Sequence, residues 1–199
     1  MELSEALTRA HRALEADPHG ILSVGHRNEI KRALVPDGDE HVGLLRRVML
    51  NDLCVRRVLP LWYAAYPDDR RPERMLELAR QLSRGQIESR AALSEEGRFW
   101  VDAVDNWEYD PETEDAVGVA LASCNSVVQA AVTSIDEAAP AGDEDDEAHD
   151  PYTEDPAYSC ASSAAGGSND QLEHSDAGKR RAFWTWYLDE AVPAAAELR

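Results

Sequence analysis

The chain has 199 residues, of which 43% are hydrophobic, so it is long enough for one globular domain with a substantial core. Its 39 acidic and 20 basic side chains give a formal net charge of −19 at pH 7. Binding to nucleic acid or to an anionic membrane surface needs a basic patch, and the sequence offers none, so neither is an expected partner.

The first third of the chain has the periodicity of amphipathic helices. Apolar residues spaced three and four apart predict a helix over residues 2–16 and a short second helix over residues 28–34. A longer apolar stripe over residues 45–66 predicts the next helix. Within this stripe Pro60 is expected to cause a break or a kink, or to lie in the first turn of a following helix.

The same periodicity continues after Pro72, and residues 140–176 interrupt it. Asp, Glu, Ser, Ala and Gly dominate this acidic, loop-rich insert, in which one short helix is expected around residues 156–165. The other helices are predicted over residues 72–84, 88–107 and 111–139, with a last one beginning at residue 176 or 177.

No alternating strand pattern and no repeat of fixed period appears in the sequence. The predicted fold is therefore all-α. We expect a single-domain bundle over residues 1–199, with about six or seven helices and a long acidic loop before the last helix.

Nearly all of the net charge lies in one part of the chain. Residues 99–178 contain no Lys or Arg and hold 20 Asp or Glu, whereas residues 1–98 are neutral. Because like charges repel, this concentration favours a surface that steers a basic protein partner and rejects nucleic acid. The alternative is a solvated acidic face without a partner. The candidate partner-binding residues are the carboxylates of the densest run: Asp143, Glu144, Asp145, Asp146, Glu147, Asp150, Glu154 and Asp155.

The sequence contains none of the common catalytic or nucleotide-binding motifs. No His lies at metal-ligand spacing from a second His or a Cys, and the carboxylates around His149 do not match a calcium-binding loop. Neighbouring acids such as Asp102 and Asp105 could act in acid–base chemistry, but they are also what an exposed helix face carries. We therefore predict no catalytic residue, no cofactor and no metal. An enzyme of unknown class stays as an alternative.

Three Arg pairs, at residues 46–47, 56–57 and 70–71, could each receive an acidic patch of this protein, within one subunit or across a homodimer. Trp184 and Trp186 are two residues apart on a predicted helix, so they cannot face the same way. One is expected to pack in the core, and the other to contact a partner or lie under the acidic loop.

The remaining sequence features concern the cellular compartment. Cys54, Cys124 and Cys160 lack metal-ligand spacing, which predicts reduced thiols, with Cys54 and Cys124 as small core residues. No apolar run approaches the roughly 20 residues that span a bilayer. The N-terminus also lacks the basic start and apolar stretch of a secretion signal. These features predict a cytoplasmic protein.

Two blocks of the sequence resemble a known family. The first contains the runs RVLPLW at residues 57–62 and YPDDRRP at residues 66–72, followed by a helix that closes at Gly85. The second contains YSCAS, GG, KRRAFWTWYL and AVP between residues 158 and 193. Both are similar to blocks of the immunity proteins of bacterial polymorphic toxin systems, the type numbered five.

The resemblance implies an all-α protein that is encoded beside a toxin and that binds and silences it in the producing cell. It supplies no catalytic motif, and the matched residues resemble a turn and two helix anchors. Together with the charge, it predicts an immunity protein that neutralises a cognate toxin domain through an acidic surface complementary to a basic toxin face. The alternative is an acidic α-helical interaction or regulatory module with no toxin partner.

Overall fold

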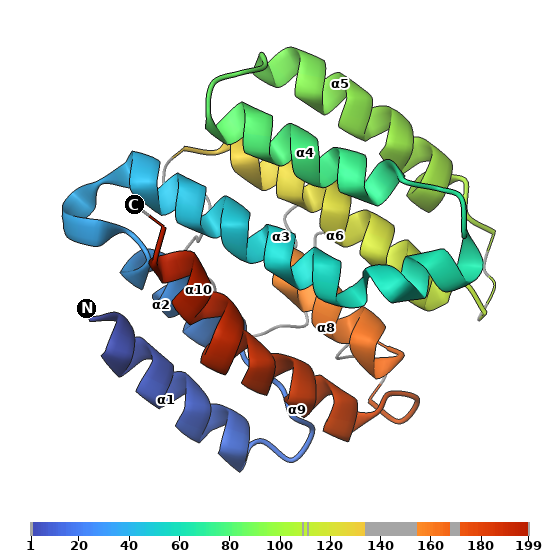
Figure 1. Cartoon of the computed structure of the whole chain (residues 1–199). Coiled ribbons are helices and arrows are strands. Elements are labelled where there is room, and N and C mark those ends of the chain that lie inside the picture. The colour runs from blue at the N-terminus through green and yellow to red at the C-terminus, as the bar shows by residue number, and fades with distance from the viewer. Residues whose placement is uncertain (1, 109, 111, 134–154, 168–171, 199) are drawn as a thin grey trace.

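The computed structural model describes residues 2–108, 110, 112–133, 155–167 and 172–198, and every regular element in these residues is helical (Figure 1). The all-α prediction is therefore confirmed. The elements in chain order are α1 (Leu3–Ala16), α2 (Val24–Ala33), the 3₁₀ turn η1 (Pro36–Gly38), α3 (Glu40–Ala65), α4 (Arg71–Ser83), α5 (Ser89–Trp100), the π-helical turn η2 (Val101–Asp105), α6 (Glu114–Ala131), α8 (Pro156–Ala165), α9 (Ala177–Trp186), the π-helical turn η4 (Tyr187–Ala191) and α10 (Val192–Ala196).

Helix α6 lies at the centre of the bundle and packs against α3, α4, α5 and α8 (Figure 1). Its small and apolar residues permit this position, because Ala120, Ala122, Cys124 and Val127 are all 0% exposed. Helices α1 and α2 and the C-terminal helices form a layer on the other side of α3.

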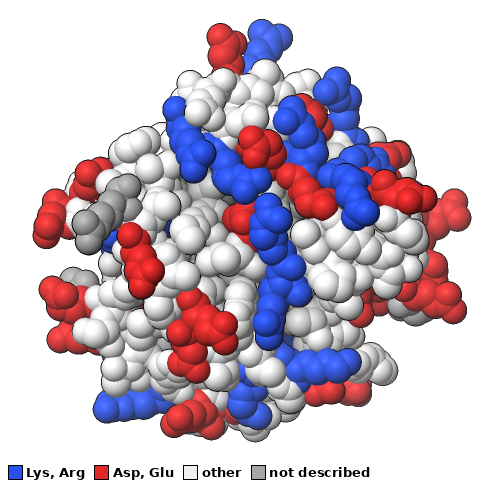
Figure 2. All heavy atoms as spheres, in the orientation of Figure 1, with Lys and Arg blue, Asp and Glu red and all other residues white. Residues whose placement is uncertain are grey.

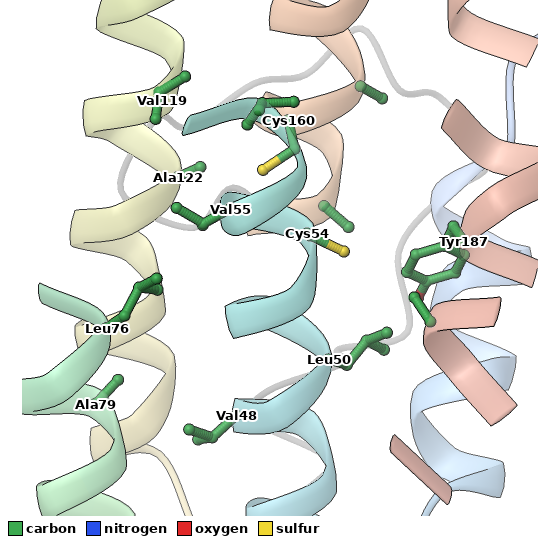
Figure 3. Packing of buried hydrophobic residues seen from close by; sticks show 14 of the residues in the cluster. Val48, Leu50, Cys54, Val55, Leu76, Ala79, Val119, Ala122, Cys160 and Tyr187 are labelled. Atoms are coloured by element: carbon green, nitrogen blue, oxygen red, sulfur yellow. The ribbon is translucent and has the colours of Figure 1, made fainter. Parts of the chain in front are cut away.

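The core between these layers is built around α3. Val48 and Val55 point from α3 toward α4 and α6, whereas Leu50 and Cys54 point toward Tyr187 of η4 (Figure 3). Cys54, Cys124 and Cys160 are all buried and carry free thiols, which confirms Cys54 and Cys124 as core residues.

Pro60 does not end α3, which continues to Ala65. Its ring lies on an exposed face, where the carbonyl that loses its helical partner can meet water. Figure 1 shows α3 changing direction in the part that contains Pro60, as expected for a proline kink.

The helix predicted over residues 88–107 begins as α5 and then widens into the π turn η2. The amide of Asn106 donates to the carbonyl oxygen of Val101 at 2.9 Å, which is the longer loop of a π turn. The Trp100 indole also donates to the Asp105 carboxylate at 2.8 Å, across the same turn. The sequence did not predict this turn, because a hydrogen bond between residues i and i+5 does not follow the 3.6-residue apolar period of an α-helix.

Candidate functional site

Most of the predicted partner-binding carboxylates lie outside the described residues. These are Asp143, Glu144, Asp145, Asp146, Glu147, Asp150 and Glu154. The remaining one, Asp155, is described, and it lies inside the protein with 8% of its surface exposed. Its carboxylate is thus placed in the interior and not on an outer acidic surface.

Asp155 joins α8 to α2 through two buried cations. Its Oδ2 atom lies 3.1 Å from Arg27 Nε and 3.1 Å from Lys31 Nζ, both on α2. Its Oδ1 atom accepts a hydrogen bond from the Ala157 amide at 3.0 Å, so the same carboxylate caps the N-terminus of α8. The Arg27 guanidinium also lies 5.3 Å from the ring centre of Tyr158. The cluster therefore holds helices together.

Burial and the neighbouring charges shift the pKa values of this cluster in opposite directions. Burial alone would raise the pKa of Asp155, but Lys31 and Arg27 outweigh burial and hold this pKa below its ordinary value. Burial lowers the pKa of Lys31, and the Asp155 carboxylate offsets that effect only in part. Each charge in the cluster is therefore stabilised by its partner and not by solvent.

The Arg pairs divide into two kinds of contact. Arg56 and Arg71 bind carboxylates of their own chain, which is one of the two predicted arrangements. The other Arg side chains donate to backbone carbonyl groups or lie over rings: Arg46 and Arg47 bind Leu198 and Thr133, and Arg57 and Arg70 lie over Trp186 and Tyr63.

The two tryptophans on α9 lie in different environments, and the prediction that one of them packs in the core is confirmed. Trp184 is buried with 2% exposure, and Trp186 is half-buried with the Arg57 guanidinium 4.9 Å from its ring centre. A cavity of about 280 Å³ next to this helix is lined by Arg57 and Lys179 together with apolar side chains. This hollow on α9 is basic in character.

A second hollow has the opposite character, and we call it the aromatic cleft. It has a volume of about 390 Å³ and lies where the C-terminus of α3, the start of α4 and the π turn η2 meet. Three aromatic side chains and three charged ones contribute to its lining: Trp62, Tyr66, Trp107, Arg71, Asp102 and Glu108, together with Ala103 and Asn106.

The floor and wall of the aromatic cleft are fixed by ring packing. Trp62 is 1% exposed, its ring centre lies 4.5 Å from that of Tyr66, and its indole donates to the carbonyl oxygen of Asp69 at 2.9 Å. Trp107 donates to Thr113 Oγ1 at 3.0 Å, which ties the residues after η2 to the start of α6. The rings are therefore held in place by the fold.

Arg71 organises the charged side of the aromatic cleft. The Asp69 carboxylate accepts hydrogen bonds from the Arg71 amide at 2.9 Å and from its guanidinium at 2.6 Å, and Arg71 also pairs with Asp102. Partial burial would raise the pKa of Asp69, but these Arg71 contacts outweigh it and lower that pKa. The guanidinium also lies 4.7 Å from the ring centre of Phe99. Arg71 is thus neutralised by carboxylates on both sides.

The acidic residues next to the aromatic cleft are exposed. They follow one another between α5 and α6, and no Lys or Arg separates them in the sequence: Asp102, Asp105, Glu108, Asp110 and Glu112. Figure 2 shows acidic side chains at the edge of the molecule where this connection lies, and a band of Lys and Arg across the middle of the same face, over α3. Acidic side chains also lie among these basic ones and at the opposite edge of the same face (Figure 2), so the two charges are mixed over much of it.

Comparison with protein families decides the classification of this chain. The family model described as Immunity protein Imm5 matches residues 7–194. The chain belongs to the Imm5 family of immunity proteins. No curated protein matches it. The resemblance predicted from the two sequence blocks is confirmed, since both blocks lie within the matched residues.

The first block of this Imm5 protein builds one wall of the aromatic cleft. Trp62 comes from its first run, and Tyr66 and Arg71 come from the YPDDRRP run. The opposite wall comes from residues 102–108. The sequence identified the turn but not the cleft, because the cleft forms only when η2 packs beside that turn.

The described part of the Imm5 chain offers neither a metal site nor a membrane-spanning helix. Within it, no three His, Cys, Asp or Glu side chains gather in the way that a metal site requires. None of its helices combines the length and the apolar character needed to pass through a lipid bilayer.

Proposed function

We propose that this Imm5 protein neutralises a toxin domain by binding it, and that its acidic half docks on a basic face of the toxin. The observation that carries the proposal is the charge partition, in which residues 99–178 hold 20 acidic side chains and no basic one. Family membership makes a toxin the natural partner. Many toxins that attack nucleic acid carry basic clefts, and a strongly acidic surface can occupy such a cleft in place of phosphates.

The described residues support the position of such a surface. The exposed acids from Asp102 to Glu112 lie on one connection between helices. Several carboxylates of the neutral half are paired with Arg residues of the same half, as Asp52 is with Arg56 and Glu95 with Arg74, whereas the acidic half has no Lys or Arg of its own and its Asp102 pairs with Arg71 of the neutral half. A basic partner would therefore be drawn toward the acidic half, where a one-signed field accelerates encounter.

Co-expression with the toxin domain of the neighbouring gene tests the proposal. We expect the producing cells to survive only when this chain is present, and the two proteins to co-purify as a complex. Survival without the chain, or a toxin that remains active and separate in its presence, would contradict neutralisation. Such a result would favour an interaction or regulatory module that has no toxin partner.

The acidic run gives a kinetic prediction. Changing Asp143, Glu144, Asp145, Asp146 and Glu147 to Asn or Gln should slow association with the toxin by about 10-fold or more at low ionic strength, and the difference should shrink as salt screens the field. Stopped-flow mixing at several salt concentrations measures this. The matched control neutralises five exposed acids of the neutral half: Glu2, Glu5, Glu15, Asp37 and Glu88. Equal slowing in both variants would show that net charge, not its position, controls association.

A further inference from the structure

The aromatic cleft combines rings and carboxylates within one hollow of about 390 Å³. Ligand pockets in proteins usually span about 300–1,000 Å³, so this cleft is at the lower limit and suits one long side chain. Its rings come from Trp62, Tyr66 and Trp107, and the ring faces of aromatic residues attract cations. Size and ring chemistry therefore point to a single cationic group.

The charges of the aromatic cleft lead to the same occupant. Arg71 is the cation in the lining, and Asp69 and Asp102 pair with it. Glu108 adds a further carboxylate at an exposed position, so the cleft is negative overall. An anionic side chain would be repelled here, and a neutral apolar one would remove water from the carboxylates without replacing its hydrogen bonds.

We propose that the aromatic cleft receives one Lys or Arg side chain of the toxin. The aliphatic part of that side chain lies along the rings of Tyr66 and Trp107, and its charged end meets Glu108 and Asp102. This inference rests on the proposed function, because it names the contact through which the complex is anchored. Aromatic and Arg contacts in a formed pocket are typical of the few residues that dominate an interface.

A charge reversal at the rim tests the inference directly. In the complex with the toxin domain of the neighbouring gene, Glu108→Lys should raise the Kd by about 10- to 100-fold, because the introduced Lys would repel the cationic side chain of the toxin. The matched control is Glu173→Lys, at another exposed position of the same acidic half, which changes the net charge equally. The control should change the Kd less than about threefold, since rim charges away from the contact contribute little. Circular dichroism verifies that both variants fold.

A second pair of variants tests the rings. Tyr66→Leu removes a ring face of the cleft and should weaken binding, whereas Tyr63→Leu changes another half-buried tyrosine near the same end of α3 and should not. Equal effects of the two leucine variants, or weakening by Tyr66→Leu without any effect of Glu108→Lys, would overturn the inference in favour of an apolar contact.

Alanine substitutions of the toxin's Lys and Arg residues identify the occupant, with the Kd measured by calorimetry. One of these substitutions in the toxin should raise the Kd of its complex with the wild-type immunity protein. With that toxin variant, Glu108→Lys should raise the Kd little further, because the two changes remove the same contact. If the wild-type complex forms but Glu108→Lys and Glu173→Lys bind equally, the inference about the cleft fails and the proposed function stands. If no complex forms and no protection is seen, the proposed function fails, and the inference fails with it.

Discussion

Asp155→Asn should lower the free energy of unfolding by about 3–5 kcal/mol, the usual cost of breaking a buried ion pair from one side. The substitution removes the negative charge that both Arg27 and Lys31 contact, at side chains that are 3% and 4% exposed. Asparagine keeps an oxygen for the Ala157 amide, so the cap of α8 is retained. The decrease in the free energy of unfolding therefore measures the contribution of the negative charge. Urea unfolding monitored by tryptophan fluorescence measures the difference.

Lys31→Met provides the matched comparison within the same cluster. It removes the ammonium whose pKa burial already lowers, and it leaves Asp155 with Arg27 and the Ala157 amide. We therefore expect a change of less than about 1 kcal/mol, or a small stabilisation. Similar losses in Asp155→Asn and Lys31→Met would show that the cluster acts through packing and not through charge.

The pH dependence of the Asp155 effect follows from the direction of its pKa shift. The folded pKa lies below the unfolded one, so the unfolded chain binds more protons as the pH approaches the ordinary value of about 3.9. The stabilisation is complete above that value and is lost as the pH falls through the lower folded pKa. The gap between wild type and Asp155→Asn should therefore be constant from about pH 5 to 7 and narrow below about pH 4. A gap that widens in acid would contradict this role.

The buried position of Asp155 and its two ion pairs were not predictable from the sequence. In the sequence it follows Glu154 at the end of a long acidic stretch, and nothing in the composition separates the two residues. The local signal was Asp155 directly before Pro156, which is the pattern of a helix N-cap followed by proline in the first turn. That pattern indicates a helix start, but it does not reveal two cations from α2, because those lie more than a hundred residues away in the sequence.

The helices themselves were predictable where the apolar stripe has a 3.6-residue period. The range predicted over residues 2–16 agrees with α1. The short helix expected around residues 156–165, which the composition of the insert indicated without such a period, agrees with α8. The aromatic cleft was not predictable in this way, since its two walls come from residues 62–71 and 102–108. Its shape depends on the widened turn η2 and on the contact between Arg71 and Asp102, both of which are products of tertiary packing.

Gly20→Ala should also lower the free energy of unfolding strongly, by about 2–5 kcal/mol. Gly20 has a φ of 69°, and this left-handed region costs a residue with a Cβ atom about 1–2 kcal/mol. A Cβ atom here would lie 2.7 Å from the carbonyl oxygen of Ala177 and 2.9 Å from Cβ of Arg181, which adds about 1–3 kcal/mol of overpacking. The neighbouring loop is held against α9, where Arg180 donates to the His19 carbonyl oxygen at 3.4 Å, so the contact cannot easily open.

Gly38→Ala separates the cost of the left-handed backbone from the cost of the close contacts at the added Cβ atom. Gly38 has a φ of 78°, but nothing lies within 4 Å of its added Cβ atom, so only the backbone cost of about 1–2 kcal/mol is expected. The difference between the two variants in chemical denaturation therefore reports how closely the turn after α1 approaches the start of α9. If Gly20→Ala costs no more than Gly38→Ala, this close approach does not contribute to stability.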